Sequence, residues 1–275
     1  MKMEADHPNF LNPPVVEVAL SVQFEPLDRL NAATLGLYWS QLRTSFPNAE
    51  QQPPLEPIVE RFGLPESISP SLRIELSDAT NVPRLWLVNR DKSELLQLQR
   101  DRFTHNWRKN IQPYPHYPSL RESFISRYQS FVDFLDREDI GAIRPNQCEV
   151  IYINHIQHPD PKLTHSKLED TLTLWTGRYN RPLRLDTEDV FVHVRYPLNG
   201  HGRAPTGRLH LDIQPAFRHP DGDPILVQTL TARGLPSSPD LDGILTFFDT
   251  GRQHILDLFV DVAAPTVLKL WDRQP

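Results

Sequence analysis

The sequence predicts an α+β protein with two lobes, each a mostly antiparallel sheet backed by helices. Three observations indicate this fold class. Alternation of apolar and polar residues, typical of half-buried strands, recurs in both halves of the chain. Each half also contains a long helical stripe of apolar residues. A proline-containing stretch at 158–162 separates the halves, so the expected lobes are residues 1–158 and 159–275.

The first lobe is expected to follow the order β-α-β-β-α-β of a ferredoxin-like unit. Strict alternation predicts a strand at residues 15–24, and Asp28 is a suitable cap for a helix that ends before Pro47. Residues 50–83 are interrupted by prolines and are expected to be irregular, apart from one strand near 72–76.

The rest of the first lobe is predicted from two further patterns. Alternation at 84–91 and 95–107 predicts a hairpin around Asp91-Lys92-Ser93. Apolar residues at three- and four-residue spacing then predict a helix at 117–137, and residues 147–156 complete the lobe as a strand.

The second lobe is expected to follow the order β-β-β-α after a short helix at 166–175. The strands are predicted at 188–196, 208–214 and 225–232, with turns at His201-Gly202 and Asp221-Gly222. Asp240 is a suitable cap for a long helix that continues to about residue 261.

The composition describes an ordinary folded protein, with 39% hydrophobic and 23% charged residues. A net charge of −6 gives no overall attraction to nucleic acid or to an anionic membrane. Cys148 is the only cysteine, which excludes an intrachain disulfide and a thiolate metal cluster and fits a reducing cytoplasm. No apolar run reaches the length of a membrane span or of a signal-peptide core. We therefore expect a cytoplasmic protein with no membrane partner.

Sequence motifs of several common enzyme classes are missing from the chain. It contains no G-x-G-x-x-G, no G-x-x-x-x-G-K-[ST], no H-E-x-x-H and no G-x-S-x-G. His254 lies near Asp249 and Asp257, but no serine or cysteine nucleophile is recognisably linked to it. No catalytic residue and no cofactor are therefore assigned, and intrinsic catalysis is not expected.

One group of residues nevertheless keeps an enzymatic alternative open. His210 and Asp212 share one face of an expected strand, and His193 lies on the same-sense face of the strand before it. Two imidazoles and a carboxylate are a suitable ligand set for Zn²⁺ or Fe²⁺. If the three side chains converge, the chain would be a metal-dependent hydrolase.

A basic stretch at 84–109 supports another alternative, which is binding of RNA or single-stranded nucleic acid. Seven Lys or Arg residues stand there against three acids. Cations beside stacking side chains are what single-strand binders use. The side chains concerned are Arg100, Arg102, His105, Trp107, Arg108 and Lys109. The aromatic pair with which ferredoxin-like sheets bind RNA is missing.

The strand expected at 95–107 carries the strongest recognition signal in the sequence. If it is extended throughout, alternation places Gln97, Gln99, Asp101, His105 and Trp107 on one face. A face so rich in amide, carboxylate, imidazole and indole groups suits recognition better than packing.

Three stretches of the chain resemble the signatures of one family. They are NPPVVEV at 12–18, LLQLQRDRF at 95–103 with HNWRK at 105–109, and QCEVIYINH at 147–155. The chain is similar over nearly its whole length to this sporadically distributed bacterial family of uncharacterised function. The resemblance implies no activity and no catalytic residue. The patchy distribution of the family implies accessory gene content, such as defence or toxin–antitoxin modules.

The signatures coincide with the polar-faced strands, so we expect one connected hydrogen-bonding surface, placed between the two lobes. Its expected members are Glu17, Gln97, Gln99, Asp101, His105, Asn106, Trp107, Glu149, Tyr152, Asn154 and His155. The expected function is that of a bacterial cytoplasmic interaction protein. It would bind a protein partner in a regulatory, antitoxin-like or defence-associated role, without catalysis of its own.

Overall fold

The centre of the fold is a nine-stranded sheet in the order β3-β4-β5-β6-β2-β7-β10-β9-β8, in which all neighbouring strands are antiparallel. The computed structural model describes residues 9–62, 82–177, 187–199 and 204–274. The strands are β2 (Val15–Phe24), β3 (Asn48–Gln52), β4 (Arg84–Val88), β5 (Glu94–Gln99), β6 (Arg102–Arg108), β7 (Pro145–Ile156), β8 (Val192–Leu198), β9 (Gly207–Phe217) and β10 (Pro224–Gly234). A separate pair, β1 (Asn9–Phe10) and β11 (Arg273–Gln274), joins the two ends of the described chain.

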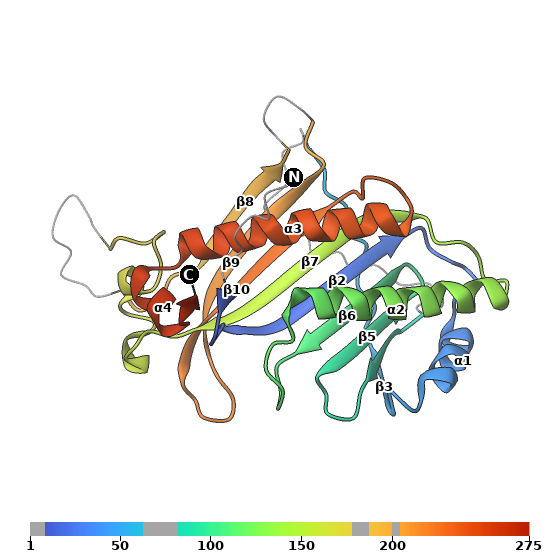
Figure 1. Ribbon diagram of the computed structural model, residues 1–275, viewed down its shortest axis with the longest axis horizontal. Coiled ribbons are helices and arrows are strands. Elements are labelled where there is room, and N and C mark those ends of the chain that lie inside the picture. Colours follow the sequence, from blue (N-terminus) through green and yellow to red (C-terminus); the bar gives the residue numbers. More distant parts are fainter. Residues whose placement is uncertain (1–8, 63–81, 178–186, 200–203, 275) are drawn as a thin grey trace.

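Two long helices, α2 (His116–Arg137) and α3 (Leu241–Val262), lie across the same face of this sheet (Figure 1). They touch where Phe124 of α2 meets Phe248 of α3, with ring centroids 4.9 Å apart. Shorter helices are α1 (Ala32–Leu42) and α4 (Pro265–Leu270), and two 3₁₀ turns lie at Pro161–Leu163 and Leu168–Asp170. No helix in the described ranges is long and apolar enough to cross a bilayer.

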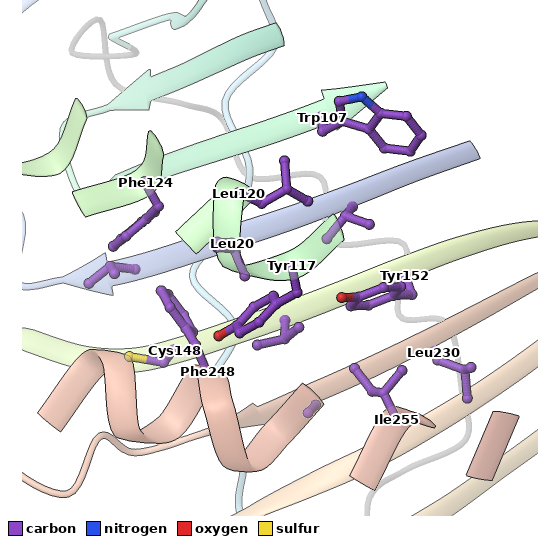
Figure 2. Close-up of a cluster of buried hydrophobic side chains, with 14 of the residues drawn as sticks. Leu20, Trp107, Tyr117, Leu120, Phe124, Cys148, Tyr152, Leu230, Phe248 and Ile255 are labelled. Carbon is purple, nitrogen blue, oxygen red and sulfur yellow. The ribbon is translucent and has the colours of Figure 1, made fainter. Parts of the chain in front are cut away.

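The hydrophobic core lies between the sheet and these two helices (Figure 2). The central strands contribute every second residue, as their alternation predicts, and the opposite residues point away from the helices. Leu20, Phe103, Val150 and Leu211, from four different strands, are almost fully buried there. Cys148 belongs to the same core, and burial raises the pKa of its thiol.

Most predicted elements are confirmed. Strand β2 begins and ends at the residues predicted for it, 15 and 24, and both long helices lie within a residue or so of their predicted bounds. Asp240 caps α3, since its carboxylate accepts the backbone N–H of Gly243 at 2.9 Å. The expected α+β class, with antiparallel sheet backed by helices, is thus confirmed.

Several local predictions were wrong. Asn31, not Asp28, caps α1, because its side chain accepts the N–H of Thr34 while the Thr34 hydroxyl accepts that of Asn31. The helix expected at 166–175 is only a 3₁₀ turn at Leu168–Asp170. Strand β3 was not predicted. The strand expected near 72–76 and the turn expected at His201-Gly202 lie outside the described residues.

The strand expected at 95–107 is in fact two strands, β5 and β6, joined by a turn at Arg100 and Asp101. With β3, this adds two strands to the first half, so the order expected for a ferredoxin-like unit is not confirmed. The sheet also runs on across the expected boundary at residue 158, because β7 pairs with β10. The division into two lobes therefore stays a prediction.

Candidate binding face

The face of the sheet turned away from α2 and α3 carries amide and charged side chains, and we call it the polar face. Its members follow from the strand register, since they alternate with the core residues. The residues discussed below are Glu17, Gln23, Arg84, Trp86, Gln97, Gln99, Arg102, Asn106, Gln147, Glu149, Arg208, His210, Asp212 and Arg233.

Residues 53–62, which we call the strap, are bound along this face in irregular conformation. Gln99 binds the main chain of the strap twice, because its amide oxygen accepts the N–H of Leu55 and its amide nitrogen donates to the Leu55 carbonyl, both at 2.8 Å. The same nitrogen lies 2.7 Å from a carboxylate oxygen of Asp101, which orients the amide.

A second contact with the strap is centred on Gln23. Its amide oxygen accepts the N–H of Ile58 at 2.9 Å and a guanidinium N–H of Arg102 at 2.7 Å. Arg102 also donates to the carbonyl of Glu56 at 3.3 Å. Beside it, Gln147 is buried, and neither of its side-chain polar atoms has a hydrogen-bond partner in the described part of the chain.

The third contact holds the carboxylate of Glu60, and we call Arg208, His210 and Arg233 the basic clamp. Glu60 accepts hydrogen bonds from His210 at 2.7 Å, from Arg233 at 3.3 Å and from Arg208. Burial opposes ionisation of Glu60, but the bonds from His210 and Arg208 and the charges of His210 and Arg233 outweigh it and lower its pKa to about 2.

Two further contacts extend the basic clamp. Arg208 donates to the carbonyl of Arg61 at 2.6 Å, and its guanidinium lies 4.4 Å from the ring centroid of Phe62. Arg233 also donates to Glu149 at 2.7 Å, which balances part of the positive charge. The basic clamp is therefore a partly buried site for a carboxylate on an extended chain.

A second polar cluster lies at the other end of the face, and its hydrogen bonds run among β2, β4, β5 and β6. Asn106 donates to Glu17 at 2.6 Å and accepts from the Gln97 amide at 2.8 Å. The Gln97 oxygen in turn accepts from Arg84 at 2.9 Å and from the indole of Trp86 at 3.0 Å. Buried amides in such a relay have fixed orientations.

Six of the eleven sequence-predicted site residues belong to these two groups. Glu17, Gln97 and Asn106 form the second cluster, whereas Gln99, Asp101 and Glu149 act at the strap. His155 lies at the end of β7, where its N–H donates to the carbonyl of Pro14. Burial, followed by the charges of Arg218 and Lys109, lowers its pKa.

The other four point to the helix-covered face. The His105 ring nitrogen lies 3.1 Å from the Glu94 carboxylate, and the Trp107 ring packs on Tyr114 with ring centroids 5.2 Å apart. The Tyr152 hydroxyl is 3.1 Å from the Tyr114 hydroxyl. The Asn154 amide donates to the side-chain oxygen of Gln228 at 3.0 Å. The expectation of one connected surface was wrong for these residues. For His105 and Trp107 the cause is the two-residue turn, which reverses the chain and moves odd-numbered residues to the opposite face.

The expected metal ligands are not assembled. His193 lies 2.6 Å from Asp212, but His210 is bound to Glu60 instead. Across the described ranges, no group of three His, Cys, Asp or Glu side chains is placed to share a metal ion.

Sequence reasoning missed the strap and the basic clamp. Glu60 lies in a stretch without periodicity, and Arg233 lies near the end of β10, a largely apolar strand, so neither carried a local signal. Alternation at 15–24 already placed Gln23 on the polar face, and Arg102 could have been found in the same way once the turn at Arg100-Asp101 was recognised.

No protein-family model matches the chain, and no curated protein matches it either.

Proposed function

We propose that this chain is a protein-binding protein whose polar face holds an extended acidic segment of a partner protein. One observation carries the proposal. The side chains of this face already bind an extended piece of polypeptide, the strap, through its main chain and through one carboxylate.

The contacts suit recognition of a peptide. Gln99 pairs with both main-chain groups of one residue, as a neighbouring strand would, and this pairing is independent of the side chain it meets. The basic clamp adds selectivity, because two guanidinium groups and an imidazole favour a carboxylate at one position. A main-chain contact and a carboxylate contact together define an extended acidic ligand.

The strap is held in a way that allows exchange. Its apolar side chains Leu55, Ile58 and Val59 are 38%, 42% and 52% exposed, so apolar burial contributes little to its attachment. What remains are hydrogen bonds, worth about 0.5–1.5 kcal/mol net between neutral groups and about 1.5–3 kcal/mol where a charged group takes part, as at Glu60. Gln147, buried with unused polar atoms beside Gln23, offers a longer or differently placed segment a further contact.

The basic stretch at 84–109 favours a protein partner over nucleic acid. Arg100 is paired with Asp28, Arg102 with Gln23, and Arg108 with Glu17. Trp107 packs beneath the helices, where a base cannot stack on it. The arginines at 100, 102 and 108 and the ring of Trp107 are thus engaged within the chain.

The test is binding of the strap sequence in trans. A fluorescent peptide with the sequence PPLEPIVERF is titrated into the whole chain carrying Glu60→Ala, which weakens the attachment of its own strap but leaves the polar face intact. We expect fluorescence anisotropy to give a dissociation constant between about 1 µM and 1 mM. The unaltered chain should bind the peptide at least tenfold more weakly.

Two controls make this test decisive. Glu56→Ala removes the same charge from an exposed position of the strap and should behave like the unaltered chain. Glu60→Ala combined with Arg208→Ala and Arg233→Ala also frees the strap but removes the basic clamp, and it should lose binding. Equal peptide binding by the triple variant and by Glu60→Ala alone would refute the polar face as a peptide site.

The wider interpretation rests on this proposal. An exchangeable acidic peptide is the kind of contact that a regulatory, antitoxin-like or defence-associated partner would make in the cytoplasm, without catalysis by this chain. We also propose that the chain belongs to a sporadically distributed bacterial family and divides into two lobes at residue 158. Cross-linking of the Glu60→Ala chain in its host, followed by mapping of the linked residues, would test whether a partner protein contacts the polar face.

A further inference from the structure

A partly open cavity of about 300 Å³ lies on the other side of the sheet, between α2, α3 and the N-terminal residues. Its floor is formed by Tyr152 of β7 and Leu230 of β10, and Ile255 of α3 lies above them (Figure 2). Phe10 and Phe259 close one side. The volume is at the lower end for small-molecule sites, which suits a small ligand rather than a peptide.

One cationic side chain lines the cavity, and no acid of the described residues forms an ion pair with it. Arg252 lines the wall, with its guanidinium 4.7 Å from the ring centroid of Tyr117. Its Nε atom is buried and has no hydrogen-bond partner within the described residues. The nearby carboxylate of Asp249 is occupied by the Tyr117 hydroxyl at 2.7 Å and by Arg121 at 3.0 Å. An unsatisfied buried guanidinium N–H costs free energy unless an acceptor arrives.

Hydrogen-bonding groups stand next to this cation. The hydroxyls of Tyr114 and Tyr152 are 3.1 Å apart, and both residues line the cavity. Burial raises the pKa of both hydroxyls, so they remain protonated and can donate. Asn154 also lines the wall, with its amide nitrogen fixed on Gln228 at 3.0 Å. Donors and a cation at one place, with apolar walls elsewhere, form an anion site with a hydrophobic extension.

We infer that this cavity binds a small monocarboxylic acid with an apolar body. The carboxylate would pair with Arg252 and accept a hydrogen bond from a tyrosine hydroxyl, which satisfies the buried donor. The hydrocarbon part would lie against Leu230, Ile255 and Phe259. This site is separate from the polar face, because it lies on the helix-covered side of the sheet.

The experiment compares three probes of equal chain length by isothermal titration calorimetry on the whole chain: octanoate, 1-octanol and octylamine. We expect octanoate to bind at one site per chain with a dissociation constant below about 1 mM. Octanol should bind at least tenfold more weakly, and octylamine should give no heat. Arg252→Met, which keeps the length of the side chain, should weaken octanoate at least tenfold, and Arg252→Lys should fall between the two.

Controls separate local from general effects. Arg144→Met removes an exposed cation that does not line the cavity and should leave octanoate affinity within twofold. Ile255→Trp fills the cavity without altering charge and should stop octanoate binding, so the inference stays testable if Arg252→Met fails to fold. Failure of octanoate to bind, equal binding of octanol, or equal loss in Arg144→Met would each overturn the inference. Glu60→Ala should leave octanoate binding unchanged, which keeps this result independent of the peptide proposal.

Discussion

The two faces of the same sheet are covered in physically different ways. On one face, Phe103 packs among Phe124, Tyr128 and Phe131 of α2, with ring centroids 5.8, 5.5 and 5.3 Å away. On the other, the strap is held by amide, guanidinium and carboxylate contacts, while its own apolar side chains stay exposed. The first cover is stabilised by apolar burial, and the second by a few directional bonds.

This difference indicates which face of the sheet stays covered as long as the chain is folded. Apolar burial over two long helices can be undone only by unfolding, because every residue contributes and none can be replaced by water. A cover held by hydrogen bonds can exchange its partners with water or with another chain at small cost. We therefore place the structural role on the helix-covered face and the exchangeable contact on the polar face.

The largest expected effect breaks the helix-covered face. Phe131→Ala removes a fully buried ring between the sheet and α2, so it should lower the free energy of unfolding by about 3–5 kcal/mol. Urea denaturation followed by circular dichroism measures this loss. Phe191→Ala, at a side chain that is 69% exposed, is the matched control and should change it by less than about 0.5 kcal/mol. Similar losses at both sites would mean that α2 is not firmly packed.

The helix-covered face is also the part that sequence reasoning predicted well. Apolar residues at helical spacing in α2 and strict alternation in β2 are signals repeated over many residues, so a single exception cannot hide them. Alternation also placed Glu17, Gln97 and Gln99 away from the core.

What sequence reasoning missed depends on contacts that no local pattern records. The turn at Arg100-Asp101 has no glycine or proline, and its one turn-favouring residue, Asp101, fitted the alternation, so the stretch looked continuous and His105 was assigned to the opposite face from the one it occupies. The strap has no periodicity at all. Its main contact joins Glu60 to Arg208, which is 148 residues further along the chain, and only the folded sheet brings them together.

A smaller loss of unfolding free energy is expected from the one buried carboxylate discussed on the helix-covered face, that of Glu94. The carboxylate of Glu94 accepts bonds from His105 at 3.1 Å and from Arg127 at 3.0 Å. Burial opposes its ionisation, but these bonds outweigh it and lower the pKa of Glu94. Glu94→Gln should therefore cost about 1–3 kcal/mol of unfolding free energy, since a buried imidazole and a guanidinium lose a charged acceptor.

The control for this second prediction is an exposed pair. Asp139 and Arg29 are 2.6 Å apart, but their side chains are 94% and 60% exposed, so Asp139→Asn should cost less than about 0.5 kcal/mol. Both values come from urea unfolding at pH 7. If Glu94→Gln proves as mild as Asp139→Asn, the buried charges are already satisfied by water, and the contrast between the two faces is weaker than we argue.

The third prediction, and the sharpest for the comparison, concerns acid release of the strap. Because the pKa of Glu60 in the folded chain is about 2 and its ordinary value is 4.5, its contribution is complete above pH 4.5 and is lost as the pH falls toward 2. Glu60→Gln removes that contribution at every pH. The difference in unfolding free energy between the unaltered chain and Glu60→Gln should thus be constant near neutrality and shrink between pH 4.5 and 2.

The same substitution should act locally at pH 7.5, where it frees the strap without loosening the core. Trypsin should cut after Arg61 faster in Glu60→Gln than in the unaltered chain, because the carbonyl of Arg61 then loses its fixed position beside Arg208. Glu56→Gln, at an exposed position of the same segment, should change neither the cleavage rate nor the pH dependence. Cleavage that accelerates by more than the fall in global stability accounts for is what an exchangeable cover requires. A strap that loosens only when the whole chain unfolds would instead belong to the core, and the two faces would then be covered by one cooperative unit.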